Sequence, residues 1–364
     1  MAIRYGLIGS GMMGQEHIRN LNLLDGCEVV AVVDPNRYMR DLSRQTADSD
    51  IQTFTQHGDM LSSMDLDALI IVSPNDSHHQ ILKDVMPTGL PILCEKPLCT
   101  SAVECREIIQ LNKNRTAPIW VAMEYRYMPP IAKLMDEIKR GTVGDPVMIS
   151  IREHRFPFLH KVDNWNRFES KTGGTLVEKC CHFWDLMRLI IKSPPTRVYA
   201  SGGMDVNFLD ESYHGRKPDI FDNAFVVLDF ENGARGMLDL CMFAEGSYWQ
   251  EVVSVTGEKA RIEAKVPGPA RFSTDGKERY SKLEVSHRHS KEVTIKTIEV
   301  DEKILQAGDH HGSTFYQHQR FRDLIISGKN QPEVSIEDGL WSVLIGEAAE
   351  LSAKTGRAVD LKDM

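Results

Sequence analysis

The strongest constraint on the fold is a glycine motif that follows the first apolar run of the chain. Residues 3–8, IRYGLI, have the composition of a buried strand, and Gly9, Gly11 and Gly14 come directly after it. Asp34 lies twenty residues beyond Gly14, at the end of the next apolar run. Glycines spaced in this way between a strand and a helix, with an acid at that distance, form the fingerprint of a dinucleotide-binding fold. The alternative is a structural turn that holds no ligand.

Each part of this motif has a physical role. Gly9 makes the tight turn, Gly11 lets the backbone approach a pyrophosphate, and Gly14 allows close packing of helix against strand. Met12 and Met13 open the helix, whose free N–H groups and positive potential suit a phosphate. We therefore expect these five residues to bind the cofactor.

Asp34 bears on which dinucleotide is bound. Its carboxylate can accept hydrogen bonds from both ribose hydroxyls and would repel a 2′-phosphate, which favours NAD. Arg37, three residues further on, could partly support NADP. We expect NAD, with NADP as the alternative.

The first 120 residues alternate between short β-branched runs and helical segments. Continuous apolar runs of this kind are typical of strands buried on both faces, and their alternation with helices predicts a parallel sheet. The predicted strands are 3–8, 28–33, 68–72, 91–94 and 118–123, and the predicted helices are 12–24, 36–46, 76–86 and 100–113, the last capped by Thr100 or Ser101.

Beyond residue 124 the pattern changes to strands and turns, with helices at either end. We expect helices near 129–141, 174–191, 312–327 and 337–354, a strand near 146–153, and a hairpin that turns at Asn232-Gly233. Such segregation predicts an α+β domain with a largely antiparallel, open sheet. The expected organisation is an α/β Rossmann domain over 1–123 and an α+β domain over 124–364, with 337–364 able to pack back towards the first.

Composition excludes several functional classes. The chain has 364 residues, a net charge of −9 and a pI near 5.8, so binding to nucleic acid or to an anionic membrane is not expected. Its seven cysteines match neither a disulfide framework nor a paired metal motif, and we expect reduced thiols in the cytoplasm. We expect no signal peptide and no membrane span.

A second candidate site is the tripeptide Glu95-Lys96-Pro97 at the end of the fourth predicted strand. Ligands of doubly wound sheets bind at this edge, and Pro97 keeps Lys96 out of a helix. The residues by themselves leave two interpretations open: a solvated Glu–Lys pair, or an active site.

The helix predicted for 174–191 favours the second interpretation. It is mostly apolar, yet Glu178, His182 and Asp185 recur on one face. A histidine oriented by a carboxylate is the usual proton shuttle. A structural polar network is an alternative, as is a metal site of Glu178, Cys181 and His182, although such a site lacks a fourth ligand.

Several motifs together resemble the Gfo/Idh/MocA family, the glucose–fructose oxidoreductase and inositol dehydrogenase group. The matches span nearly the whole chain and include the dinucleotide loop, the tripeptide at 95–97 and the 337–361 tail. They also include Pro74-Asn75-Asp76-Ser77-His78, Trp165-Asn166-Arg167 and the helix from Gly173 to Asp185. The resemblance implies NAD(P)-dependent oxidation of a secondary alcohol of a sugar or cyclitol, with hydride transfer to nicotinamide C4. It also implies a homodimer or homotetramer formed through the open sheet.

The resemblance further implies residue roles. Lys96 would orient the substrate hydroxyl, His182 would be the general base, and Glu178 stands where the family has an Asp. Cofactor contacts are implied for Ser73, Asn75, His78, Glu95, Lys96, Glu124, Trp165 and Arg167. Substrate contacts are implied or expected for Arg126, His154, Arg155, Lys179, His182 and His311. We expect no metal, and we expect His17, His57 and His79 to be surface residues.

Other functions remain open. An NAD-dependent glycosidase or lyase would oxidise its substrate transiently and keep its cofactor. A non-catalytic NAD-sensing regulator is a second alternative, and a diol dehydrogenase acting on other alcohols is a nearer one.

Overall fold

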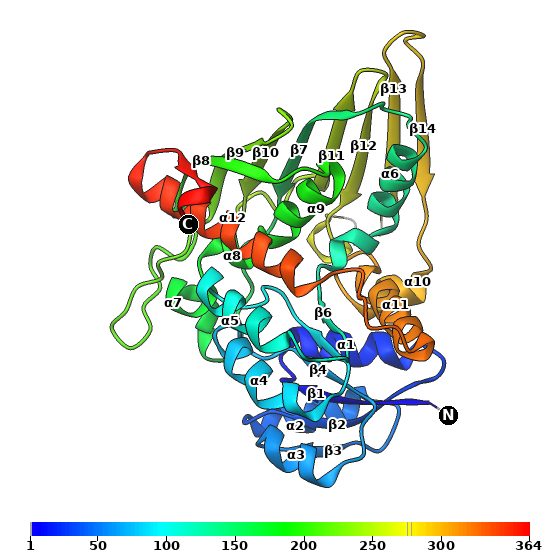
Figure 1. Ribbon diagram of the computed structural model, residues 1–364, viewed down its shortest axis with the longest axis vertical. Helices are drawn as coiled ribbons and strands as arrows, with labels where there is room; N and C mark the ends of the chain where they lie inside the picture. Colours follow the sequence, from blue (N-terminus) through cyan, green and yellow to red (C-terminus); the bar gives the residue numbers. More distant parts are fainter. Residues whose placement is uncertain (1, 275, 278) are drawn as a thin grey trace. The chain divides into compact units, whose positions relative to one another are not determined.

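A computed structural model describes residues 2–274, 276–277 and 279–364. The chain divides into two compact units (Figure 1). The first unit comprises Met1–Glu124, Lys161–Trp165 and Asp301–Val343, and the second comprises Tyr125–His160, Asn166–Val300 and Leu344–Met364. The sequence placed 301–343 in the second domain, whereas the structure groups these residues with the first.

The first unit is built on a parallel sheet of six strands in the order β3-β2-β1-β4-β5-β6. Strands β1 to β3 are added towards one edge of the sheet and β4 to β6 towards the other, so the order of addition reverses between β1 and β4. This is the order of a doubly wound dinucleotide-binding domain. The strands are β1 (Ile3–Ile8), β2 (Cys27–Val33), β3 (Gln52–Phe54), β4 (Ala68–Ile71), β5 (Ile92–Cys94) and β6 (Ile119–Val121). The predicted fold class of this unit is confirmed.

The helices of this unit follow the predicted segments, with ends that differ by a few residues. They are α1 (Met12–Asn22), α2 (Arg37–Thr46), α3 (His57–Ser63), α4 (His78–Val85) and α5 (Ala102–Asn112), with 3-10 turns η1 (Asn75–Ser77) and η2 (Met86–Thr88). Ser101 caps α5, since its side chain accepts from Glu104 N. The sequence prediction missed β3 and α3, because β3 is only three residues long and neither segment has a continuous apolar run.

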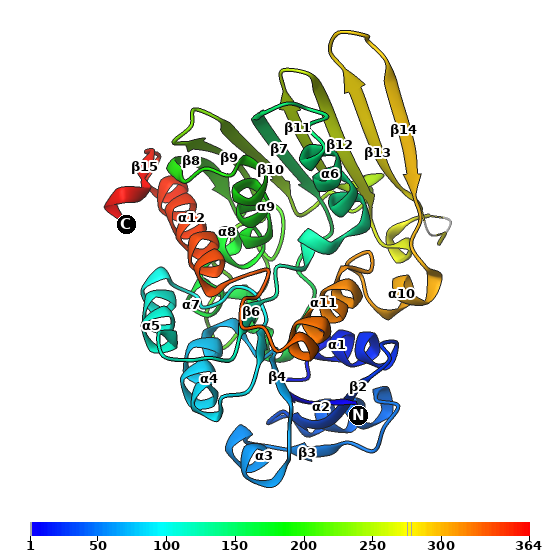
Figure 2. The same ribbon diagram turned by 45° about the vertical axis from the view of Figure 1, so that its right-hand side comes forward.

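The late segment of the first unit packs against α1. It contains α10 (Glu302–Ala307), α11 (Ser313–Ser327) and the start of α12 (Ile336–Thr355). α11 lies beside α1 in both views (Figures 1 and 2). A backbone hydrogen bond from Val121 to Val334 joins the segment to the edge strand β6. These contacts explain why residues so late in the chain belong to this unit.

The second unit is built on a nine-stranded sheet in the order β14-β13-β12-β11-β7-β10-β9-β8-β15. All neighbours are antiparallel except β7 and β10. The strands are β7 (Pro146–His154), β8 (Pro195–Gly203), β9 (Asn223–Phe230), β10 (Arg235–Cys241), β11 (Trp249–Gly257), β12 (Ala260–Pro267), β13 (Ser281–His287), β14 (Val293–Ile298) and β15 (Val359–Asp360). The predicted α+β class and the hairpin between β9 and β10 are confirmed.

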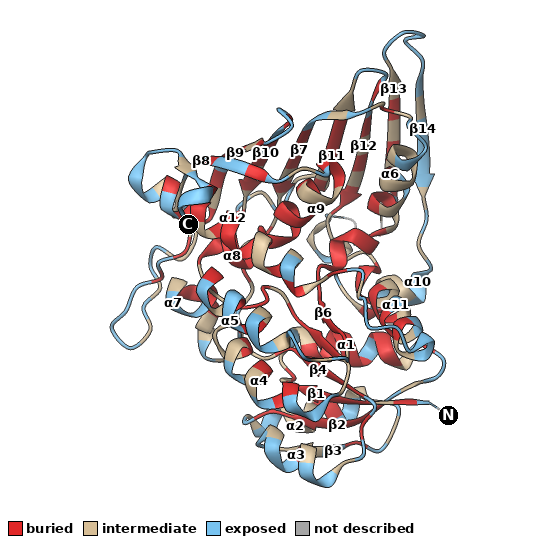
Figure 3. Cartoon of the chain, in the orientation of Figure 1, coloured by how far each residue is buried: buried red, intermediate tan, exposed pale blue. Residues whose placement is uncertain are grey.

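Helices cover one face of this sheet, and the strands alternate accordingly (Figures 2 and 3). In β9, Ala224, Val226 and Leu228 are buried, whereas Phe225 and Val227 are exposed. This alternation shows that the described residues leave the opposite face of these strands without such a cover. The helices are α6 (Pro129–Lys139), α7 (Glu169–Thr172), α8 (Thr175–Glu178), α9 (Cys181–Ile191) and the end of α12, and the remaining 3-10 turns are η3 (Glu124–Tyr127), η4 (Val162–Arg167), η5 (Ala270–Phe272) and η6 (Leu361–Asp363).

The single helix predicted for 174–191 is interrupted between α8 and α9. The carbonyl of Leu176 accepts from the indole Nε1 of Trp184 at 2.8 Å. Cys180 N instead contacts Thr175 O, at 3.4 Å. Competition for one carbonyl thus breaks the regular helix between Glu178 and His182, so the simple one-face prediction does not describe this segment.

Candidate active site

The glycine loop between β1 and α1 is shaped to receive a phosphate. Gly9 has φ +97°, and a Cβ there would lie 2.6 Å from Ser73 N. A Cβ on Gly14 would lie 2.9 Å from Gly9 O, whereas a Cβ on Gly11 would meet no described atom within 4 Å. Gly11 also caps α1 without a side-chain hydrogen bond, which leaves first-turn N–H groups for an anion. The loop therefore fits the pyrophosphate of a dinucleotide.

Asp34 follows β2 and is only 9% exposed. Its Oδ2 accepts from Ser10 N at 2.9 Å, and its Oδ1 accepts from Asn36 N at 2.8 Å. These bonds fix the carboxylate beside the glycine loop and leave Oδ1 able to accept a further hydrogen bond. The arrangement suits the predicted ribose contact, which stays a prediction.

The loop after β4 carries Ser73, Asn75 and His78. Asn75 is buried, and its Nδ2 has no hydrogen-bond partner among the described residues, so it can donate to a ligand. His78 is fully buried and contacts two carbonyls, Pro97 O at 2.8 Å and Ser73 O at 3.0 Å. Burial lowers the pKa of His78. The contacts show that this histidine ties the β4 loop to the segment after β5, a structural role that the sequence did not predict.

Glu95 and Lys96 follow β5, at the sheet edge where the glycine loop follows β1. Glu95 is buried and Lys96 is half-buried. Glu95 Oε2 accepts from Lys96 N at 3.1 Å, and Glu95 Oε1 lies 3.0 Å from His17 Nε2. The Lys96–Pro97 peptide bond is cis. Lys96 therefore follows β5 at the ligand-binding edge of the parallel sheet, where its backbone N–H donates to Glu95.

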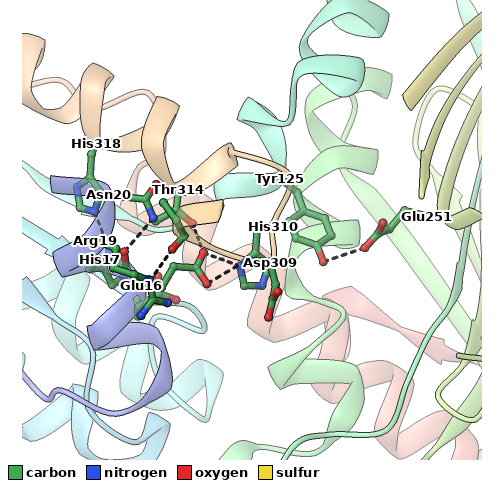
Figure 4. Close-up of polar contacts among 12 residues, drawn as sticks. Glu16, His17, Arg19, Asn20, Tyr125, Glu251, Asp309, His310, Thr314 and His318 are labelled. Carbon is green, nitrogen blue, oxygen red and sulfur yellow. Dashed lines mark hydrogen bonds and ion pairs between the residues drawn. The ribbon is translucent and has the colours of Figure 1, made fainter. Parts of the chain in front are cut away.

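His17 is not the surface residue that the sequence suggested. It is fully buried on α1, and its Nδ1 lies 2.7 Å from Nε2 of His318 on α11 (Figure 4). Burial would raise the pKa of Glu95, but the hydrogen bond and charge of His17 outweigh it and lower that pKa. His57 and His79, by contrast, are partly exposed and pair with Asp84 and Glu107.

A second acidic group of the first unit, Glu124, is also buried. Burial, together with the charge of Glu95, raises the pKa of Glu124 to about 7. This carboxyl can therefore exchange a proton near neutral pH. Its predicted place beside the nicotinamide riboside stays a prediction.

Glu16 on α1 organises the loop before α11 (Figure 4). Its Oε1 contacts His310 Nδ1 at 2.9 Å and accepts from Thr314 Oγ1 at 2.8 Å. Burial would raise the pKa of Glu16, but His310 and Thr314 lower it to about 2. The neighbouring His311 is half-buried, and desolvation lowers its pKa to about 4. The His311 imidazole is therefore neutral at physiological pH.

Trp165 and Arg167 fall in different units. Trp165 lies beneath the Lys161 ammonium, 4.3 Å from the ring centroid. Arg167 is buried, donates to Glu211 Oε2 at 2.8 Å and stacks on Phe208. The predicted cofactor contacts of both residues stay predictions.

The polar residues of α8 and α9 have partners that the sequence did not predict. Arg126 binds Asp185 through two hydrogen bonds of 2.6 and 2.5 Å, and both side chains are buried. Asp185 is therefore paired with an arginine from η3. Glu178 and His182 are also buried, and the structure places them on either side of the interruption between α8 and α9.

A buried polar cluster beside His182 was missed by the sequence analysis. Lys179 Nζ lies 2.9 Å from Glu153 Oε1 and donates to Tyr125 Oη at 2.6 Å. Tyr125 Oη in turn donates to Glu251 Oε1 at 3.3 Å (Figure 4). The period of two would have indicated both acids, since Glu153 shares the buried face of its strand with Ile149 and Ile151, and Glu251 shares that of its strand with Val253 and Val255.

His154 lies on the opposite face of the sheet from its neighbour Glu153, because successive strand residues alternate. It contacts Asp239 Oδ1 at 3.0 Å. The predicted substrate contact of His154 stays a prediction. Arg155 is half-buried, contacts Glu153 Oε1 at 3.4 Å and stacks on Phe156.

Within the part of the chain that the structure describes, no group of histidine, cysteine or acidic side chains is arranged to hold a metal ion. The candidate set of Glu178, Cys181 and His182 is therefore not arranged as a metal site. No described helix is long and apolar enough to span a membrane. All seven cysteines lie among the described residues, and none of them forms a disulfide bond.

Comparisons with known proteins agree with the fold and the glycine loop. Residues 3–123 match the oxidoreductase family (GFO_IDH_MocA) NAD-binding Rossmann fold, and residues 136–361 match that family's C-terminal alpha/beta domain. The chain is 24% identical to a myo-inositol 2-dehydrogenase of Thermotoga maritima, over all of this chain and 99% of that protein. It is 27% identical to the rhizopine catabolism protein MocA of Rhizobium meliloti, over 70% of this chain and 76% of that protein.

Solved structures share the fold. A levoglucosan dehydrogenase in complex with NADH and levoglucosan superposes with a TM-score of 0.81 at 18% identity, covering 99% of this chain and 100% of that one. The two family matches together span most of the sequence. The chain therefore belongs to the Gfo/Idh/MocA family of NAD-binding oxidoreductases.

Proposed function

We propose that this protein oxidises a secondary hydroxyl of a sugar or cyclitol and uses NAD⁺ as the hydride acceptor. The observation that carries the proposal is the place of Lys96, which follows β5 at the same sheet edge as the glycine loop after β1. A lysine ammonium at the ligand-binding edge of a dinucleotide domain is suited to stabilising negative charge on a reacting oxygen. The relatives named for myo-inositol and levoglucosan support a polyhydroxylated substrate.

The cofactor would be held by residues whose geometry suits it. The N–H groups of the first turn of α1 would bind the pyrophosphate, Asp34 the ribose, and Asn75 would donate through its free Nδ2. When bound, NAD⁺ supplies the acceptor for the hydride that leaves the alcohol carbon.

The side chains of the protein remove the proton of the substrate hydroxyl. His182 is the general base that takes the proton of the substrate hydroxyl, and the Lys96 ammonium stabilises the negative charge that develops on its oxygen. Glu178, buried before the break between α8 and α9, would anchor the substrate or orient His182. The pKa of His311 is lowered to about 4, so its imidazole is neutral at higher pH. A neutral imidazole can donate a hydrogen bond to a substrate hydroxyl or accept one from it.

A spectrophotometric screen at 340 nm tests this function. Inositols, aldoses and glycosides would be offered with NAD⁺ and NADP⁺ in parallel. Net reduction of NAD⁺ by a polyol or sugar supports the proposal. Release of an aglycone without net reduction would favour a glycosidase or lyase, and cofactor binding without any turnover would favour a regulator.

We also propose that the protein forms a homodimer or homotetramer through the sheet face that the helices leave uncovered. Val227 is the cross-strand neighbour of both Tyr199 and Met237, and their side chains are 45%, 47% and 44% exposed. A continuous apolar row of this kind is typical of a surface that another chain covers. The seven cysteines, none of which forms a disulfide bond, support a reducing compartment, the cytoplasm.

A further inference from the structure

The side chain of His182 is stacked on a tyrosine. The imidazole and the Tyr125 ring are almost parallel, at 8°, with centroids 4.1 Å apart. The ring of Phe183 approaches the same tyrosine edge-on, with the two ring centroids 5.9 Å apart. Tyr125 and His182 are each only 2% exposed, so neither ring is free to reorient in solvent.

Stacking fixes a histidine without using its nitrogens. The hydrogen bonds of an imidazole lie in the plane of the ring, whereas Tyr125 contacts one of its faces. The stack therefore defines the plane in which both nitrogens of His182 point, and the stacking contact itself uses neither nitrogen. This is the geometry that a general base requires.

The tyrosine is in turn held at its hydroxyl. Tyr125 Oη accepts from Lys179 Nζ at 2.6 Å and donates to Glu251 Oε1 at 3.3 Å. Lys179 is kept in place by Glu153, at 2.9 Å. Bonds on two sides of the hydroxyl restrain rotation of the Tyr125 side chain, and thereby movement of the stacked imidazole.

The two acids of this cluster are neighbours in the sheet. Glu153 on β7 and Glu251 on β11 are direct cross-strand partners, and both are buried. Lys179 and Arg155 both lie near Glu153, but their charges do not outweigh the effects of burial and of Glu153 on Glu251. A carboxyl in this position is expected to hold a proton more tightly than usual.

We propose that Tyr125 is the positioning residue for the His182 imidazole, and that Lys179 and Glu251 hold the Tyr125 hydroxyl so that this ring stays in place. The inference rests on the proposed role of His182 as general base. It assigns Lys179 to Tyr125 and Glu153, where the sequence had assigned it to the substrate.

Glu251 makes the positioning of His182 by Tyr125 sensitive to pH. Burial, reinforced by the charge of Glu153, raises the pKa of Glu251 to about 7. Above this pH the carboxylate accepts a charge-assisted bond from Tyr125, and below it the bond is a weaker neutral one. The groups that face Glu251 are Glu153, Lys179, Arg155, Tyr125 and Gln250.

Substitutions at position 125 separate stacking from hydrogen bonding. Tyr125→Phe keeps the ring and loses the hydroxyl, whereas Tyr125→Leu loses both. We expect kcat to fall several-fold in Tyr125→Phe and on the order of 10²-fold in Tyr125→Leu, with KM for NAD⁺ nearly unchanged. Tyr5→Phe, which removes a buried tyrosine hydroxyl within the parallel sheet, is the matched control and should leave kcat unchanged.

Proton NMR of the His182 ring gives a readout that does not depend on turnover, with the resonance assigned through His182→Gln. Ring-current shifts from Tyr125 should persist in Tyr125→Phe and vanish in Tyr125→Leu. Glu251→Gln keeps an acceptor that does not titrate, so the acid limb of kcat/KM against pH should become less steep than in the wild-type protein.

Two results would overturn the inference. One is a Tyr125→Leu variant with wild-type kcat, and the other is an unshifted His182 resonance in the wild-type protein. A wild-type protein that binds NAD⁺ but oxidises no alcohol would instead overturn the proposed function, while the NMR comparison would still decide whether Tyr125 fixes the imidazole.

Discussion

The carboxylate of Glu95 and the imidazole of His17 lie 3.0 Å apart inside the first unit. Glu95 directly precedes Lys96 in the chain. The His17 side chain is fully buried, and that of Glu95 is 6% exposed. The exposed pair of His57 and Asp84 has the same 3.0 Å distance, but its side chains are 23% and 38% exposed. Because the two pairs have the same distance, a comparison between them measures how burial changes the contribution of such a pair to stability.

We predict that His17→Leu lowers the free energy of unfolding by about 1–3 kcal/mol, because Oε1 of the buried Glu95 carboxylate loses its hydrogen bond with His17. His57→Leu should change it by less than about 1 kcal/mol, since exposed pairs contribute little. Urea denaturation of both variants measures the difference. Equal losses would contradict the account of this pair.

A second prediction concerns stability and pH. Glu350 Oε1 accepts from Leu176 N at 2.9 Å, and burial raises the pKa of Glu350 to about 7. The unfolded chain releases this proton near pH 4.5, so the folded state loses stability as pH rises from there to about 7. Glu350→Gln keeps the acceptor but cannot ionise, and it should exceed the wild-type protein in stability above pH 7 by at most about 3 kcal/mol.

The advantage of Glu350→Gln should disappear near pH 5. Denaturant midpoints at pH 5, 6, 7 and 8 measure it, with the exposed Glu231→Gln as control. A difference that did not vary with pH would show that the Glu350 carboxyl does not titrate as described.

A third prediction concerns the choice of cofactor. Arg37, Arg40 and Arg44 line a cavity of about 470 Å³, and Arg40 binds the backbone carbonyl of Asp34. These arginines suit a 2′-phosphate, whereas the Asp34 carboxylate repels one. Asp34→Ser should therefore raise kcat/KM for NADP⁺ on the order of 10–10²-fold.

Asp41→Ser is the matched control for Asp34→Ser. Asp41 pairs with Arg37 and Arg44, so its loss removes these two ion pairs while Asp34 stays in place. It should raise kcat/KM for NADP⁺ less than Asp34→Ser does. Steady-state kinetics with both cofactors decides, and a wild-type preference for NADP⁺ would overturn the role given to Asp34.

The uncovered sheet face yields a fourth prediction. Val227→Lys places a charge in the centre of the apolar row with Tyr199 and Met237. Light scattering should show a smaller assembly for this variant. Val103→Lys, at a 72% exposed position on α5, should leave the mass unchanged. A wild-type protein that is monomeric at micromolar concentration would contradict the proposal.

Much of the fold could be predicted because its signals are local. The glycine loop, the alternation of strands and helices and the Asn232-Gly233 hairpin each depend on neighbouring residues. The burial of His17 could not be predicted in this way, because its partners are Glu95 and His318, the latter 301 residues away. The interruption between α8 and α9 likewise depends on a tertiary hydrogen bond, from Trp184 to Leu176.

The candidate site was predicted only in part for the same reason. Family motifs indicated Lys96 and His182, but the partners of such residues are set by sheet register and packing. Glu153 and Glu251 meet because β7 pairs with β11, and Arg126 meets Asp185 only when η3 packs beside α9. Strand alternation would have placed Glu153 on the inner face and His154 on the outer one.

The central claim is that Lys96 acts on the reacting hydroxyl, and the Lys96→Met variant tests it most directly. Its turnover, followed at 340 nm with the best substrate of the screen, would be compared with that of Lys83→Met, whose lysine forms a partly exposed pair with Glu107. We predict that kcat falls on the order of 10²–10⁴-fold in Lys96→Met while calorimetry shows unchanged NAD⁺ affinity. Near-wild-type kcat in Lys96→Met would contradict the account.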